Sequence, residues 1–368
     1  MAVIREVLVL IIAAISAFIF GGCSSGKSQP ENSQKFEIRG IYGSPNPFWN
    51  KGLKLNELNV NAVFLNWKGI NEKLLERAKS EGARVFAEFP LLNGKDYVEK
   101  HPEAWAIDNN GEKVKPASWF MGVCPTETGF RKFRMLELRE LLKKFDINGI
   151  WLDYVHWHAQ FEEPDPILPE TCFCERCIST FEASAGIDVP DLSTREQAEW
   201  ILSNRDSIWR EWRCSVIAGW VRDARMILKQ EDSDVLLGIY HCPWADDEFE
   251  GARYRILGLD YDMLKGNTDV FSPMVYHGRM GRPPEWVKDN IEWFCNNLEL
   301  KSGSFPKVWP IVQAYNDPYE ISVREFESVL NYGSGACATG IMMFTSNSVA
   351  ESSDKTETMK RVYSDYMK

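Results

Sequence analysis

Short apolar runs rich in β-branched and aromatic residues recur along the chain and alternate with stretches whose apolar residues are three or four positions apart. Near-continuous apolar runs are typical of parallel strands that are covered on both faces. They predict strands at 38–42, 62–67, 84–89, 149–154, 235–240, 270–276, 308–315 and 340–345. The intervening spacing predicts amphipathic helices at 71–81, 126–145, 196–229, 284–298 and 323–332.

This repeated alternation of strand and helix favours a closed parallel barrel over an open sheet. A doubly wound sheet is the main alternative, but it normally needs fewer strands, and no glycine-rich phosphate turn follows the first run. We therefore expect an α/β fold with one (β/α)8 TIM barrel over 36–368. Long loops follow the third and fourth predicted strands at 91–125 and 156–192. Both loops leave the C-terminal strand ends, where barrel enzymes build their active sites.

The chain begins with a segment unlike the rest. An apolar run at 7–20 follows Arg5 and ends in Gly21-Gly22-Cys23. The run suits a signal peptide and is short for a membrane span. Gly-Gly-Cys resembles a bacterial lipobox, which implies cleavage after residue 22 and lipidation of Cys23. We expect a lipoprotein signal peptide at 1–22, a flexible tether at 23–35 and an extracytoplasmic, membrane-anchored domain. A retained membrane anchor is the alternative.

Composition limits the partners. The net charge of −11 and the lack of a basic run disfavour nucleic acid. The 44% of hydrophobic residues supply a large core, so neither a metal nor a disulfide is needed merely to fold the chain. We expect a monomer.

Carboxyl groups stand at several predicted C-terminal strand ends. Asp153 is at the end of the fourth strand and Glu88 is at the end of the third, while Asp246 and Asp247 follow the fifth. Glycoside hydrolysis needs one carboxylate near the anomeric carbon and one carboxylic acid at the leaving oxygen. We expect Asp153 to supply the first. We expect Asp247 or Asp246, ahead of Glu88, to be the acid, because Trp244 nearby would raise its pKa by desolvation.

Other polar and aromatic residues at the strand ends are expected to bind sugar hydroxyls and sugar faces. The expected substrate-binding residues are Trp67, His156, Trp157, His241, Trp244, Tyr276, His277, Gln313, Tyr315 and Asp317. For each aromatic residue, core packing is the alternative. The histidines have a second interpretation, a catalytic zinc site made by His156 and His158 with Asp153 or His241. We favour sugar binding and expect that catalysis requires no cofactor.

Three cysteines, Cys172, Cys174 and Cys177, lie within six residues in the loop after the fourth strand. This spacing is typical of metal ligands with one ligand missing, which suggests a structural zinc. A disulfide is the alternative in an oxidising compartment. Either link would brace the loop and would take no part in the chemistry.

Two segments carry a family resemblance. Residues 148–157 are similar to the "DGI-x-(L/F)-D-Y" fourth strand of several glycoside hydrolase barrels, and residues 269–277 resemble the sixth strand of glycoside hydrolase-like proteins. The resemblance implies a barrel that cleaves an oligo- or polysaccharide, with Asp153 as the nucleophile or the residue nearest the anomeric carbon. Similar cysteine clusters bind structural zinc in some β-galactosidases of this kind.

This chain departs from the resemblance at two positions. Asn148 replaces the usual Asp and still suits a turn, whereas Val155 replaces the Glu of chitinase-like barrels and disfavours their chemistry.

Strand alternation predicts that Asp153 faces the cavity and Tyr154 the helical layer. The alternative function is a non-catalytic surface glycan-binding lipoprotein on the same barrel. A second carboxyl within about 5–10 Å of Asp153 would favour the enzyme.

Overall fold

A parallel sheet closes on itself in the computed structural model, which describes residues 36–231 and 234–368. The strands are β1 (Ile38–Tyr42), β2 (Ala62–Asn66), β3 (Arg84–Pro90), β4 (Gly149–Asp153), β5 (Leu236–His241), β6 (Val270–Val275), β7 (Lys307–Val308), β8 (Ile311–Gln313) and β9 (Gly340–Phe344). β7 and β8 both pair with β6 and together form one barrel strand, interrupted at Trp309-Pro310. The β5–β6 and β1–β9 pairings complete the ring, which confirms the predicted eight-stranded barrel.

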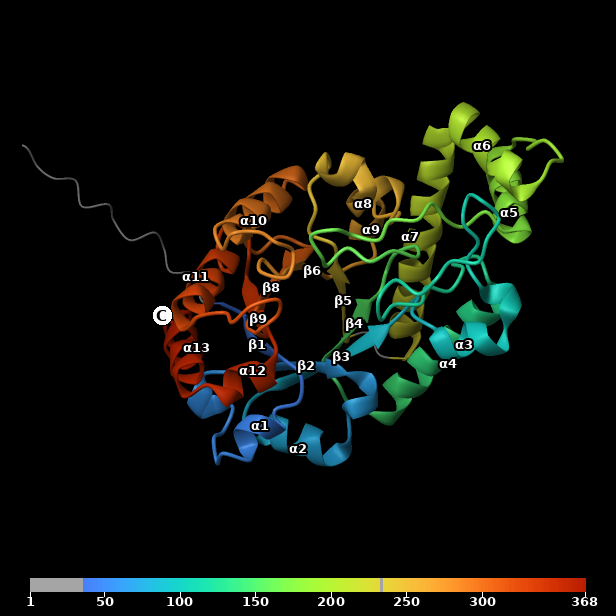
Figure 1. Cartoon of the computed structure of the whole chain (residues 1–368). Coiled ribbons are helices and arrows are strands. Elements are labelled where there is room, and N and C mark those ends of the chain that lie inside the picture. Colours follow the sequence, from blue (N-terminus) through green and yellow to red (C-terminus); the bar gives the residue numbers. More distant parts are fainter. Residues whose placement is uncertain (1–35, 232–233) are drawn as a thin grey trace, which may run out of the picture. The chain divides into compact units, whose positions relative to one another are not determined.

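Helices surround the ring of strands (Figure 1). They are α1 (Asn46–Trp49), α2 (Glu72–Ser80), α3 (Lys95–Lys100), α4 (Thr128–Lys144), α5 (Glu175–Ala185), α6 (Thr194–Asn204), α7 (Asp206–Glu231), α8 (Ala252–Arg255), α9 (Tyr261–Lys265), α10 (Trp286–Asn297), α11 (Val323–Gly333), α12 (Ser346–Glu351) and α13 (Ser353–Asp365). The single helix predicted at 196–229 is wrong, because Arg205 has φ −140° and separates α6 from α7. The two long loops contain α3 and α5. No helix in 36–231 or 234–368 is long and apolar enough to cross a membrane.

Local sequence signals explain where several helices begin and end. α6 and α11 each start with a capping box, in which Ser193 pairs with Glu196 and Ser322 pairs with Glu325. Each serine hydroxyl accepts a hydrogen bond from an otherwise unpaired backbone N–H of the first turn, and each glutamate accepts one from the backbone N–H of the cap. α5 ends at Gly186, whose left-handed φ of 63° costs a glycine little.

Aromatic side chains fill the interior of the barrel beneath the C-terminal ends of its strands. The Trp151 ring stacks on Trp309 at 5.4 Å between centroids, and its Nε1 donates a hydrogen bond to Ser272 at 2.9 Å. Gly238 makes this possible, because a Cβ there would lie 2.2 Å from the Trp151 ring. These packed rings fill the interior of the barrel beneath its C-terminal strand ends.

A disulfide joins Cys295 of α10 to Cys337, just before β9. The expected signal peptide, the tether and the lipidation at Cys23 lie outside the described residues.

Candidate functional site

A cavity of about 150 Å³ opens at the C-terminal ends of the strands. Its lining residues are Tyr42, Trp119, Asp153, Tyr154, Glu162, Tyr240, Met274, Tyr276, Arg279 and Phe344. A smaller hollow beside it shares Asp153, Trp119 and Glu162 with the cavity. The cavity therefore lies where catalytic sites of barrels are built.

Asp153 is the last residue of β4, so the rigid wall of the barrel positions its carboxyl. One carboxyl oxygen accepts a hydrogen bond from the backbone N–H of Tyr154 at 2.8 Å. Burial raises the pKa of Asp153 well above its usual range, and the negative charges of Glu88 and Glu162 raise it further. Three carboxyl groups thus interact at this end of the barrel, and they cannot all be ionised without cost.

Tyr154 does not face the helical layer, and that expectation is wrong. Its φ of 53° breaks the regular alternation of side chains where β4 ends. Its ring lines the cavity and stacks on Phe120 at 5.1 Å between centroids. Asp153 and Tyr154 consequently face the same space.

Glu88 lies deeper than Asp153. In the sheet register, Pro90 is opposite Asp153, so Glu88 is two residues below it. The Glu88 carboxylate accepts hydrogen bonds from Tyr42 Oη at 2.8 Å and Asn66 Nδ2 at 3.0 Å. Burial raises the pKa of Glu88. This carboxyl is not among the residues that line the cavity, and it acts on Asp153 through its charge.

Glu162 is the second carboxyl of the cavity, and sequence reasoning missed it. It belongs to the loop after β4 and lines the same space as Asp153. Burial raises the pKa of Glu162 to about 7, Glu163 adds to the rise, and the charge of Arg279 opposes it. The only available signal was its place in a loop whose unusual length marked it as functional.

Asp246 and Asp247, the acids favoured from the sequence, are placed elsewhere. Asp246 forms an ion pair with Arg253, and Asp247 is exposed. Trp244, expected beside them as a desolvating ring, is buried against Phe249 at 4.3 Å between centroids. None of these three lines the cavity.

Arg279 is a further residue that the sequence did not single out. Its Nε lies 3.5 Å from Glu162 Oε2, and its guanidinium lies 4.4 Å from the ring centroid of Trp119. It also donates a hydrogen bond to Tyr315 Oη at 3.1 Å and lies 3.4 Å from Asp317. Arg279 therefore links the wall of the cavity to the loop after β8.

The expected substrate-binding residues divide into three groups. Tyr276 lines the cavity, and His156 lines the adjoining hollow. Gln313, Tyr315 and Asp317 contact Arg279; Gln313 Oε1 accepts the backbone N–H of Arg279 at 3.0 Å. The third group is placed in the packed layers or away from the cavity: Trp67, Trp157, His241, Trp244 and His277.

The histidines of that third group have partners of their own. His241 Nδ1 lies 3.0 Å from the Tyr261 hydroxyl, and burial lowers the pKa of His241 to about 3. His277 Nε2 lies 2.8 Å from Glu325. Among the described residues, no histidine belongs to a group of three or more metal-ligating side chains. The structure thus does not assemble the alternative zinc site at Asp153.

His158 connects the two long loops. Its Nδ1 accepts the backbone N–H of Gly122 at 3.0 Å, and its Nε2 lies 2.9 Å from the carbonyl oxygen of Lys115. The first bond requires an unprotonated Nδ1, so the proton is on Nε2 and the ring is neutral. Burial correspondingly lowers the pKa of His158 to about 4.

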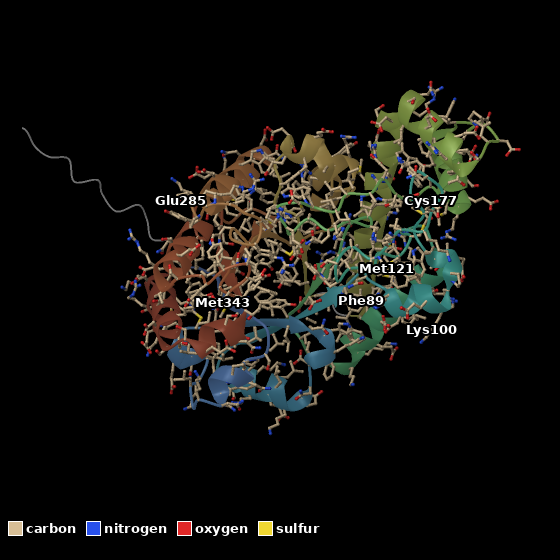
Figure 2. All side chains as sticks on the ribbon, in the orientation of Figure 1. Phe89, Lys100, Met121, Cys177, Glu285 and Met343 are labelled. Atoms are coloured by element: carbon tan, nitrogen blue, oxygen red, sulfur yellow. A yellow bond between two sulfur atoms is a disulfide. The ribbon has the colours of Figure 1, made fainter. Side chains whose placement is uncertain are left out.

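Four cysteine sulfurs gather where the two long loops meet. Cys124, from the loop after β3, joins Cys172, Cys174 and Cys177, and the four Sγ atoms lie within 4.8 Å of one another. Cys124 Sγ is 3.4 Å from Cys177 and 3.8 Å from Cys174, too far for a disulfide bond. Figure 2 places Cys177 away from Phe89 and Met343 of the barrel strands. Four thiols, three buried and one half-buried, suit a tetrahedral structural metal such as zinc.

The four-cysteine cluster lies at the far ends of the two loop segments that carry Trp119 and Glu162 to the cavity. Trp119 lies between the end of β3 at Pro90 and Cys124. Glu162 lies between the end of β4 at Asp153 and Cys172. Each wall residue therefore belongs to a segment that is held by a strand at one end and by the cluster at the other.

Comparisons with known proteins identify the fold. No protein-family model matches the chain, and no curated protein matches its sequence. Among solved structures, the glycoside hydrolase domain of PgaB (BpsB) from Bordetella bronchiseptica superposes with a TM-score of 0.63 at 13% identity, over 86% of this chain and 92% of that one. The catalytic domain of β-amylase from Paenibacillus polymyxa gives 0.63 at 11% identity, over 91% and 99%.

A third similar structure is a β-galactosidase from Marinomonas ef1, with a TM-score of 0.64 at 10% identity. It is matched over 88% of this chain, which spans 58% of the β-galactosidase. Such low identities show the fold alone. The expected glycoside hydrolase-like (β/α)8 barrel is thus confirmed as a fold.

Proposed function

We propose that this protein is an exported lipoprotein glycoside hydrolase that cleaves an oligo- or polysaccharide with Asp153 and Glu162. The observation that carries the proposal is that two carboxyl groups line one cavity at the C-terminal ends of the barrel strands. Glycosidases need such a pair. A non-catalytic glycan-binding protein does not need a second, partly protonated carboxyl beside the first.

Glu162 is proposed as the general acid. Its pKa of about 7 leaves a substantial fraction protonated at neutral pH, which is what proton donation to a leaving oxygen requires. It also lies on a loop, above the strand ends, where a carboxyl can reach the glycosidic oxygen. Its proton goes to that oxygen as the bond to the anomeric carbon breaks.

Asp153 is proposed as the carboxylate that faces the anomeric carbon. It lies on a rigid strand, and the hydrogen bond from the backbone N–H of Tyr154 offsets part of the rise in its pKa that burial, Glu88 and Glu162 cause. Protonation of Glu162 removes one of these negative charges and so favours the ionised form of Asp153. In that form it stabilises the positive charge that develops on the sugar ring. Water adds its hydroxyl group to the anomeric carbon and returns its remaining proton to the carboxyl pair, which restores the protonated Glu162, while the leaving sugar keeps the proton that Glu162 gave.

The four-cysteine cluster is proposed to hold a structural zinc, with no part in bond cleavage. Its three buried thiols and the half-buried Cys174 provide a full set of tetrahedral ligands, and its place between the loops suits a brace. Membrane attachment through Cys23 is proposed from the lipobox-like sequence alone. Mass spectrometry of the protein from the membrane fraction should find an acylated Cys23 as the first residue if that lipid is the anchor, and residues 1–22 still attached if the apolar segment is.

A glycan library assayed for released reducing ends tests the catalytic proposal. On any substrate that is cleaved, Asp153→Asn should lower turnover by at least about a thousandfold, or roughly 4 kcal/mol of barrier. Glu162→Gln should cost roughly a hundredfold to ten-thousandfold, the usual contribution of general acid catalysis. Binding of the glycan should persist in both variants.

Asp247→Asn is the matched control, since it removes an exposed carboxylate that does not line the cavity. It should retain wild-type turnover. If Asp153→Asn keeps more than about a tenth of wild-type turnover, Asp153 is not the catalytic carboxylate. If glycans bind and none is cleaved, the non-catalytic binding protein replaces the enzyme.

A further inference from the structure

A groove of about 570 Å³ lies beside the cavity and shares Trp119 with it. The groove runs along α3 and the first half of α4, and it reaches Pro90, which is opposite Asp153 in the sheet register. The cavity itself, at about 150 Å³, is smaller than the roughly 300–1,000 Å³ of ordinary ligand pockets. A chain of several sugars must therefore extend beyond it, and the groove is the adjoining space.

The groove carries an excess of positive charge. Lys68, Lys95 and Lys100 line it with exposed side chains. Within residues 36–231 and 234–368, none of the three forms an ion pair with a carboxylate. Asp96 is the only carboxylate of the lining without a cationic partner there. This excess contrasts with the net charge of −11 of the whole chain.

The remaining cation of the lining, Arg134, is already paired, since it lies 2.7 Å from Glu137. The imidazole of His101 lies 3.3 Å from Glu103 and carries a charge only when it is protonated. The three lysines are consequently the groups left to meet a ligand. Because they are exposed, their attraction for an anion is weakened by salt.

Aromatic faces accompany the lysines. Tyr97 stacks on His101 at 4.2 Å between centroids, and Phe133 and Trp119 are each 42% exposed. Flat apolar rings beside cations suit a ligand that is both amphipathic and anionic. A small inorganic anion would gain nothing from the rings, whereas a neutral sugar chain could accept hydrogen bonds from the lysines but would gain no attraction from their charge.

We propose that this groove binds the acidic sugars of an anionic glycan, one with carboxylate or sulfate groups, while the bond to be cleaved lies over Asp153. The proposal rests on the proposed function of the cavity. The charges are separated accordingly: carboxyls surround the reacting bond, and ammonium groups lie where the neighbouring sugars extend. The substrate class is thus an acidic poly- or oligosaccharide.

Binding of labelled glycans to the full chain, carrying Asp153→Asn to prevent turnover, tests this inference. The probes are oligogalacturonate, its methyl ester of the same length, and a sulfated galactan oligosaccharide with its desulfated counterpart. We expect at least one acidic probe to bind more tightly than its neutral counterpart and to weaken as salt rises. The two pairs distinguish carboxylate from sulfate as the recognised group.

Lys95→Gln with Lys100→Gln should then weaken that acidic probe by at least about fivefold at low salt, a loss expected for two exposed charge contacts. Lys229→Gln with Lys360→Gln is the matched control, because it removes the same charge from exposed lysines of α7 and α13. The inference is overturned if no acidic probe binds better than its neutral counterpart, or if both double variants weaken it equally.

Turnover separates this inference from the proposed function. Cleavage of neutral glycans that depends on Asp153, with binding indifferent to Lys95 and Lys100, would keep the enzyme and remove the acidic substrate. Lysine-dependent binding of an acidic glycan without any cleavage would keep the groove and remove the enzyme.

Discussion

The Nε atom of Arg279 lies 3.5 Å from the Glu162 carboxylate, inside the cavity that also contains Asp153. Glu163 lies 3.6 Å from the same guanidinium. Burial and Glu163 raise the pKa of Glu162, and Arg279 lowers it, so that it stays at about 7. The balance of these three influences sets the pH at which Glu162 can donate a proton.

This balance predicts opposite pH shifts from two substitutions. A general acid must be protonated, so kcat/KM should fall as pH rises past about 7. Arg279→Gln removes the charge that lowers the pKa of Glu162, so the alkaline limb should move to higher pH. Glu163→Gln removes the charge that raises it, so the limb should move to lower pH. Profiles of kcat/KM against pH for both variants check this, and shifts in the same direction would contradict the assignment of Glu162.

Glu88 should affect pH dependence more than turnover. Its negative charge raises the pKa of Asp153, so Glu88→Gln should lower that pKa and keep Asp153 ionised to lower pH. The acid limb of the profile should therefore move to lower pH. Turnover at the optimum should stay within about tenfold of wild type, because the amide oxygen of the substituted side chain can still accept the hydrogen bonds of Tyr42 and Asn66. A thousandfold loss, as expected for Asp153→Asn, would instead make Glu88 a catalytic residue.

The four-cysteine cluster predicts a metal content. The purified chain should contain about one zinc ion, and Cys124→Ser should lower that content together with the free energy of unfolding, by about 3 kcal/mol, the order of a lost loop cross-link. Elemental analysis and denaturant unfolding measure the two. Cys214→Ser is the matched control: Cys214 is a buried free thiol of α7 outside the cluster, and its replacement should leave the zinc in place. Equal zinc in both variants would disprove the metal site.

Gly238 should be the most sensitive glycine of the barrel interior. Alanine there would place a Cβ 2.2 Å from the Trp151 ring, which is locked between neighbouring aromatic rings. We expect Gly238→Ala to reduce the free energy of unfolding by about 3 kcal/mol or more. Gly266→Ala, which would meet no atom within 4 Å, is the control and should be nearly neutral. Thermal unfolding of the two variants measures both stabilities, and equal stability of Gly238→Ala and Gly266→Ala would contradict this prediction.

The strands could be predicted from sequence because each is a short apolar run between polar connections. The helix break at Arg205 could not, since neither glycine nor proline marks it and the apolar spacing continues through it. His241 illustrates a different limit. It was expected at the site because it ends a strand, yet Tyr240 beside it lines the cavity, so alternation directs His241 toward Phe294 in the helical layer.

The candidate site was predictable only where a strand carries it. Asp153 ends an apolar run, and its place at the mouth of the barrel follows from that. Glu162 and Arg279 lie in loops after different strands, and no periodicity relates them. Cys124 precedes Cys177 by 53 positions, so the missing fourth ligand was invisible until the two loops were placed side by side.

The fixed ends of the two wall segments have a consequence for how this barrel can change. Because the strand holds one end of the Glu162 segment and Cys172 holds the other, changes between these ends that keep the His158 contacts with the other loop need not disturb the frame. The same holds for the Trp119 segment between Pro90 and Cys124. The lining of the cavity can thus evolve, or be redesigned, by replacing loop sequence between these fixed ends.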